Sequence, residues 1–251
     1  GKVVKFIYNN CDLILAQSHS FINSINKYCR EDVRVEYFPS WSEELPFSHE
    51  LAQEVEYKNN TFNILFTGNI GEAQDFPAII DAAEYLRSEN VRWLIVGDGR
   101  MNDWLKAEVI NRDLESQVIL LGEFPIERMH SFYNHSQALL VSLKRDYYLS
   151  LVIPGKVQSY LMSGLPILGM GGGETEKIIK DSGCGYTCKP GDGIALAGIV
   201  NKMILTSDAN KKSMGARGRN YAIQKFDRNM LLKKLESWMY EYANHYASKT
   251  K

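Results

Sequence analysis

The sequence predicts an α/β protein built on a doubly wound, parallel six-stranded sheet. From about residue 62 onward, short apolar runs alternate with segments of helical pattern, and this alternation is typical of a parallel sheet. The runs are continuously apolar, as expected for strands that helices cover on both faces. Glycine or polar turns follow the runs, and right-handed crossovers would place helices on both sides of the sheet.

The apolar runs define the expected strands. They lie at Asn63–Thr67, Arg92–Val96, Val118–Leu121, Ala138–Ser142, Pro166–Gly169 and Tyr186–Cys188. The helices expected between and after them cover about residues 76–88, 102–113, 126–134, 155–163, 174–181, 193–206 and 210–225. Because all strands of such a sheet run the same way, their carboxyl ends are expected at one edge.

The first 41 residues differ from this regular alternation and are too short to bury a core of their own. A helix is expected at Val3–Asn9, and strands are expected at Asp12–Gln17 and Val33–Tyr37. Between the strands, Ser18 suits the N-cap of a helix that runs to about Tyr28. We expect this piece to be the remnant of a larger N-terminal α/β domain whose beginning is absent.

The rest of the chain divides into three parts. After Pro39-Ser40-Trp41 breaks the first pattern, residues 42–61 are charged and irregular, as in a linker. Residues 62–225 hold the six expected strands and form the ligand-binding domain. Residues 226–251 predict a C-terminal helix, since Leu231, Leu235, Trp238, Met239 and Tyr242 recur at helical spacing. This helix either packs on the same core or crosses back to the N-terminal piece.

Charge and hydropathy exclude two classes of protein. The 29 Lys and Arg residues against 30 Asp and Glu give a net charge of −1, and no basic block is present. The sequence therefore predicts no nucleic-acid partner. Its apolar runs are far shorter than the roughly 20 residues that a membrane-spanning helix needs.

The turns at the carboxyl ends of the strands are where an open parallel sheet binds ligands. Candidate binding residues in these turns are Gly68, Asn69, Gly71, Gln74, Gly97, Gly99, Phe124, Lys144, Gly172 and Glu174. Asn69 and Gln74 suit sugar hydroxyls or phosphate oxygens. Each glycine alone equally suits a tight turn with positive φ. Gly97 and Gly99 lack the third glycine and the acidic partner of a dinucleotide fingerprint, and no P-loop is present.

Pro154-Gly155-Lys156 predicts a phosphate site. Proline suits the first turn of a helix, and Gly155 lets a ligand approach the backbone. The helix that follows would direct free N–H groups and its positive dipole end toward an anion. Lys156 adds a cation in the same turn, and Gln158 and Ser159 lie one turn further on, where they could bind ribose hydroxyls.

These stretches resemble the C-terminal half of family-4 retaining glycosyltransferases of the GT-B fold. The likeness is carried by Thr67–Asp75, Val96–Gly99 and Pro154–Ile167, and it extends over about residues 1–245. It is strongest toward bacterial polysaccharide and O-antigen or capsule enzymes, including the N-acetyl-fucosamine transferase group. The resemblance implies a Rossmann-like donor domain and a nucleotide diphosphate sugar as donor, linked to UDP rather than GDP.

Two glutamates that many members carry eight positions apart fall here at Leu151 and Ser159, and Glu72 and Gln74 stand where the first loop usually has Arg and Lys. The resemblance then makes Lys156 the first candidate for the catalytic cation, with Lys144 or Arg145 second. Lys156 would stabilise the negative charge that develops on the departing diphosphate. The resemblance implies no cofactor and no metal. The acceptor would be a saccharide or a polyprenyl-linked sugar. The protein would act in the cytoplasm, with any contact to the inner face of the membrane made through the absent N-terminal half, and this piece alone is expected to be inactive.

Other functions stay open on the sequence alone. The missing glutamates leave room for a non-catalytic nucleotide-sugar-binding domain. A UDP-sugar 2-epimerase shares the GT-B architecture but needs paired acid and base residues, and His130 and His135 do not directly follow a strand. A dinucleotide-dependent oxidoreductase is disfavoured by the incomplete glycine pattern.

Overall fold

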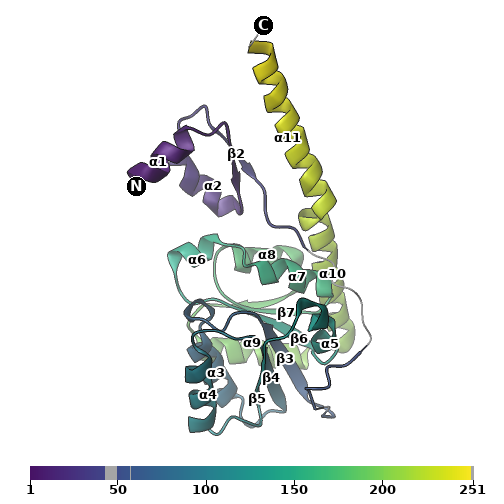
Figure 1. The fold of residues 1–251 in the computed structure, drawn as a ribbon. Coiled ribbons are helices and arrows are strands. Elements are labelled where there is room, and N and C mark those ends of the chain that lie inside the picture. Colours follow the sequence, from purple (N-terminus) through teal and green to yellow (C-terminus); the bar gives the residue numbers. More distant parts are fainter. Residues whose placement is uncertain (43–49, 57, 250–251) are drawn as a thin grey trace.

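The computed structural model describes residues 1–42, 50–56 and 58–249. Its main sheet has six strands, all parallel, in the order β5-β4-β3-β6-β7-β8 (Figure 1). The strands are β3 (Phe62–Thr67), β4 (Val91–Val96), β5 (Val118–Gly122), β6 (Ala138–Ser142), β7 (Ile167–Met170) and β8 (Gly185–Cys188). The predicted fold class is confirmed, and each predicted strand lies within two residues of its observed bounds.

The helices fall where helical patterns were expected, with one addition. They are α3 (Phe76–Tyr85), α4 (Asn102–Asn111), α5 (Met129–Tyr133), α7 (Gly155–Ser163), α8 (Glu174–Ser182), α9 (Gly193–Leu205) and α10 (Asp208–Phe226). Short 3-10 turns, η1 (Glu72–Gln74) and η2 (Ile126–Arg128), precede α3 and α5. The addition is α6 (Tyr147–Leu151), whose five residues are too few to show a helical period.

Both faces of the sheet are buried, which explains why its strands are apolar throughout. One layer packs around Phe66, Trp93 and Leu140, and α3, α4 and α9 cover it. The other packs around Leu65, Val141 and Tyr160, and includes residues of α5, α7, α8 and α10. Strand residues point alternately to the two layers, so neighbours such as Leu65 and Phe66 lie in different cores.

The N-terminal residues form a separate small α/β unit. It contains α1 (Lys2–Asn9), β1 (Leu13–Ala16), α2 (His19–Asn26) and β2 (Arg34–Tyr37), and β1 pairs with β2 in parallel. The predicted N-cap is confirmed, since Ser18 Oγ accepts from the Phe21 N–H at 3.1 Å. The same hydroxyl donates to the Leu151 carbonyl at 2.5 Å, which joins this unit to the end of α6.

The C-terminal helix α11 (Arg228–Lys249) extends beyond the sheet and runs up toward the N-terminal unit (Figure 1). The Tyr242 hydroxyl donates to the Asp12 carbonyl at 2.7 Å, and Arg34 pairs with Glu241 at 2.6 Å. These contacts hold the N-terminal unit on the same side as the carboxyl ends of the main sheet.

The segment predicted as a linker lies partly outside the described residues, at 43–49 and 57. In the described part, Ser42 N–H donates to the Phe226 carbonyl at 2.9 Å, and Ala52 and Val55 are buried in the second core layer. This described part is irregular but it packs on the domain. No described helix is both long and apolar enough to cross a membrane.

Candidate functional site

The loops after β3, β4 and β5 are hydrogen-bonded to one another at the carboxyl edge of the sheet. Gly68 N–H donates to the Val96 carbonyl at 2.9 Å, and Gly97 N–H donates to the Gly122 carbonyl at 2.8 Å. Ile70 N–H then donates to the Asp98 carbonyl, also at 2.8 Å. These bonds extend the parallel pairing past the strand ends and give the edge a fixed backbone surface.

Two of the candidate glycines are required by this backbone contact. A Cβ at Gly97 would lie 1.9 Å from the Gly68 carbonyl oxygen, and a Cβ at Gly99 would lie 2.4 Å from the Ile70 carbonyl oxygen. Both residues also have positive φ, at 144° and 158°. Their glycines are therefore explained by packing between loops, before any ligand is considered.

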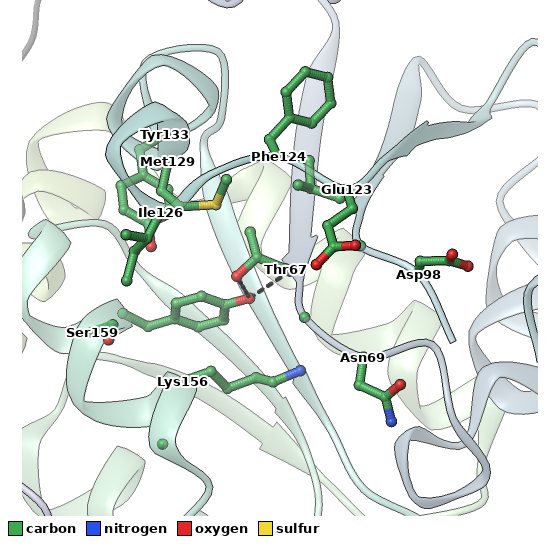
Figure 2. Close-up of a pocket in the computed structure, with 15 residues that line it drawn as sticks. Thr67, Asn69, Asp98, Glu123, Phe124, Ile126, Met129, Tyr133, Lys156 and Ser159 are labelled. Atoms are coloured by element: carbon green, nitrogen blue, oxygen red, sulfur yellow. Dashed lines mark hydrogen bonds between the residues drawn. The ribbon is translucent and has the colours of Figure 1, made fainter. Parts of the chain in front are cut away.

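A hollow with a volume of about 440 Å³ lies over this edge (Figure 2). Seven of the predicted site residues line it, namely Gly68, Asn69, Gly97, Phe124, Gly155, Lys156 and Ser159. Lys156 and Glu123 extend into it from opposite sides. The glycine loops of the sheet edge and the N-terminus of α7 thus line one pocket. The sequence alone did not show that they are neighbours.

Helix α7 presents its N-terminus to this pocket. Its N-cap is Pro154 in an extended conformation, one position before the first turn in which the sequence predicted it, and no described side chain caps the helix. The first N–H groups of a helix have no partner within it, and together with the dipole they attract anions. Gly155 is exposed, and a Cβ there would meet no protein atom within 4 Å, so packing does not require this glycine.

Lys156 supplies a cation at the same place. Its Nζ donates to Gln74 Oε1 at 3.1 Å and lies 3.7 Å from the centroid of the Phe66 ring. Burial disfavours the charged form and lowers the pKa of Lys156 to about 7. A bound anion would restore the charge, because an opposite charge at contact distance favours the ammonium form.

The opposite wall of the pocket is largely apolar and was mostly missed from the sequence. Ile126, Met129 and Tyr133 line it beside Phe124, whose ring packs 4.9 Å from that of Phe132. These residues lie in the loop and short helices after β5. The only sequence signal for them was the position of that loop at the sheet edge, since their spacing resembles an ordinary core helix.

Tyr160 was also missed as a site residue. Its hydroxyl accepts from the Thr67 N–H at 2.8 Å and lies 3.1 Å from Thr67 Oγ1, as Figure 2 shows by dashed lines. Tyr160 is fully buried in the second core layer, and this raises its pKa to about 12. It ties α7 to the end of β3 and so sets the width of the pocket.

Two predicted contacts are placed elsewhere by the structure. Gln158, expected at a ribose, is 1% exposed and does not line the pocket. Its amide nitrogen, oriented to satisfy its hydrogen bonds, lies 3.0 Å from the carbonyl oxygens of Pro154 and Gly155. Glu174, expected at sugar hydroxyls, is 4% exposed and accepts from the Ser20 N–H at 2.7 Å. Both side chains face inward because their polar atoms form hydrogen bonds with neighbouring backbone groups.

The remaining predicted residues lie around the pocket. Gly71 and Gln74 belong to the turn after β3, where Gln74 contacts Lys156. Lys144 and Gly172 line a separate hollow of about 210 Å³ at the ends of β6 and β7, together with Arg145 and Tyr147. Lys144 Nζ lies 4.0 Å from a Glu72 carboxylate oxygen. Within the described part of the chain, no three His, Cys, Asp or Glu side chains gather in a way that could hold a metal ion.

Comparison with known proteins agrees with this architecture. A family model described as glycosyl transferases group 1 matches residues 48–221. The chain is 22% identical over 241 residues to the probable glycosyltransferase WbjE of Pseudomonas aeruginosa, covering 93% of this chain and 59% of WbjE. It is 29% identical over 196 residues to the putative colanic acid biosynthesis glycosyl transferase WcaI of Escherichia coli K12, covering 75% of this chain and 46% of WcaI. It thus spans about half the length of these relatives.

Solved structures show the same fold at low identity. HepE from Anabaena, in complex with UDP and glucose, superposes with a TM-score of 0.76 at 14% identity, over 95% of this chain and 66% of HepE. The six-stranded parallel sheet is therefore that of GT-B glycosyltransferases. Since the family model covers well over half of the chain, the protein belongs to the group 1 glycosyl transferases.

Proposed function

We propose that this chain is the donor-binding part of a retaining glycosyltransferase that uses a UDP-linked sugar. One observation carries the proposal: the uncapped N-terminus of α7 and the Lys156 ammonium meet at a single pocket. Helix N–H groups and a lysine together provide the fixed positive charge that a diphosphate needs. The UDP in the HepE complex supports the choice of nucleotide.

The pocket divides naturally among the parts of such a donor. The diphosphate lies at the start of α7 beside Lys156, and the base lies toward Phe124 and the Gly97 loop. The sugar extends toward the hollow that contains Gly172. As the glycosidic bond breaks, negative charge grows on the diphosphate, and groups already oriented toward it stabilise the transition state. Lys156 is the catalytic residue in this scheme, and no metal or cofactor takes part.

The acceptor is a saccharide or a polyprenyl-linked sugar in bacterial surface polysaccharide synthesis. The name of WcaI, which refers to colanic acid biosynthesis, supports this role, and the motifs quoted above favour family 4 and the N-acetyl-fucosamine transferase group. The protein acts in the cytoplasm, with peripheral contact at the inner face of the membrane.

Isothermal titration calorimetry with UDP, GDP, their sugars and NAD tests this function. UDP and a UDP-sugar are expected to bind, GDP to bind more weakly, and NAD not to bind. Preference for NAD would support a dinucleotide-dependent enzyme instead. The stereochemistry is tested with the complete enzyme. A product whose anomeric carbon is inverted would contradict the retaining mechanism.

Replacing Gly155 with leucine should weaken UDP binding by about tenfold or more without loss of stability. The new side chain meets no protein atom near its Cβ, and leucine is a better helix former than glycine. It does, however, occupy the space through which the diphosphate reaches the helix backbone. Calorimetry and thermal unfolding of the same sample check this pair of effects. Equal UDP affinity in the variant would show that the ligand does not approach α7 here.

A further inference from the structure

The Lys156 ammonium is held by the loop across the pocket and not by its own helix. Its Nζ donates to Gln74 Oε1 and stands over the Phe66 ring. A Cβ added at Gly68 would lie 3.4 Å from Nζ, so the lysine side chain passes close by this glycine. Figure 2 shows the ammonium pointing from α7 toward Asn69, on the β3 side of the pocket. The place of this charge is therefore set by residues at the end of β3 and in the turn that follows it.

Gln74 is itself fixed by bonds within its turn and to the end of β6. Its N–H donates to the Gly71 carbonyl at 3.0 Å within the turn. Its carbonyl accepts a hydrogen bond from the Ser142 hydroxyl at the end of β6. The next backbone bond joins Lys144 N–H to the Ala73 carbonyl at 2.9 Å. Since the turn is bonded internally and to the end of β6, the Gln74 side chain starts from a fixed backbone position.

We propose that Gln74 is the positioning residue for Lys156, a neutral partner that fixes the ammonium where the donor diphosphate binds without cancelling its charge. This inference rests on the proposed function, because only an anionic donor makes use of that charge. A neutral amide accepts one of the three ammonium N–H groups and leaves two for phosphate oxygens. A glutamate at position 74 would form an ion pair and compete with the diphosphate.

Other titratable groups lie around Lys156. Asp98 and Glu123 line the pocket from the loops after β4 and β5, and Tyr133 and Tyr160 line it from α5 and α7. Burial raises the pKa of both tyrosines, so they stay neutral. Glu72 and Lys144 form a loose pair beside the Gln74 turn. No histidine is among the described residues that line the pocket.

The test is an NMR titration of lysine ¹³Cε signals in the ligand-free chain, with Lys156 assigned by its loss in Lys156→Met. We expect a Lys156 midpoint near pH 7 in the wild type. Gln74→Glu should raise this midpoint by about one pH unit or more, because it adds an opposite charge at contact distance. Gln74→Met keeps the length without the acceptor and should lower the midpoint. Glu72→Gln, an exposed change in the same turn, is the matched control and should leave it unchanged.

UDP calorimetry on the same variants completes the experiment. At pH 6.5, UDP should bind about fivefold or more weakly to Gln74→Met and about tenfold more weakly to Gln74→Glu, with Glu72→Gln like the wild type. A Lys156 midpoint that is the same in all four proteins would overturn the positioning role, even if affinities fall. Midpoints that move as expected in a chain that binds no UDP would support the Gln74 contact and overturn the proposed function.

Discussion

Replacing Lys156 with methionine is expected to remove most of the UDP affinity. The same substitution should raise the free energy of unfolding of the ligand-free protein below pH 7. A charge-assisted hydrogen bond contributes about 2 kcal/mol, so its loss should weaken UDP binding by about 30-fold or more. Methionine keeps the length of the side chain and fills the same partly buried space beside the Phe66 ring. Affinity falls while stability rises because the buried ammonium stabilises the bound diphosphate but destabilises the folded protein when no ligand is bound.

The pH dependence of this stability follows from the direction of the pKa change. Burial lowers the pKa of Lys156 from 10.5 to about 7, so the folded protein binds this proton less tightly than the unfolded chain does. Between about pH 7 and 10.5 the unfolded chain holds more protons, and stability from this group rises with pH. Below pH 7 the full free-energy cost of burying the Lys156 ammonium is present, and above pH 10.5 this cost is zero because the lysine is neutral in both states.

Thermal unfolding of the wild type and Lys156→Met at pH 6 and pH 10 checks this account. The variant should unfold several degrees higher at pH 6, and the difference should shrink toward pH 10. Lys106→Met, which removes an exposed lysine of α4 outside both hollows, is the control and should show neither the stability gain nor the loss of UDP affinity. A destabilised Lys156→Met protein at pH 6 would mean that the lysine supports the fold.

The substitution Gly97→Ala should destabilise the domain by about 4 kcal/mol or more. Its Cβ would lie 1.9 Å from the Gly68 carbonyl oxygen and 2.8 Å from the Gly68 carbonyl carbon, and both are backbone atoms that cannot rotate away. Relief requires the β3 and β4 loops to separate, which breaks hydrogen bonds between them and opens the pocket. Such losses are at the upper end of single-residue effects.

Gly122→Ala separates steric contact from backbone conformation. Gly122 has a positive φ of 82°, but a Cβ there would meet nothing within 4 Å. This variant should lose only about 1–2 kcal/mol, which is the cost of placing an L-residue in that region. Urea unfolding of the two variants should therefore give clearly different free energies. Equal losses would show that conformation alone explains both glycines.

The strands could be predicted closely because burial on both faces leaves a continuous apolar signal that loops cannot imitate. The N-cap at Ser18 was equally readable, since capping depends on one side chain and its own helix. Helix α6 was not readable, because five residues show no period. The packing of Ala52 and Val55 on the domain was missed, since an irregular segment has no pattern that reveals burial.

The candidate site was predictable in its loops but not in the direction of its side chains. The position of Lys156 after Gly155 was enough to place it at a helix start. Nothing in the sequence showed that Gln158, two residues later, points into the protein, or that Glu174 accepts from the N-terminal unit. The sequence also could not separate Gly97, which packing requires, from Gly155, which it does not. Those distinctions depend on contacts between loops from different strands.

A crystal structure of the chain with UDP would show where the diphosphate binds. We expect it at the first turn of α7, within hydrogen-bond distance of the helix N–H groups and of Lys156 Nζ, with the uracil ring toward Phe124. UDP bound in the hollow formed by Lys144 and Gly172, with the α7 N-terminus free of phosphate, would contradict it.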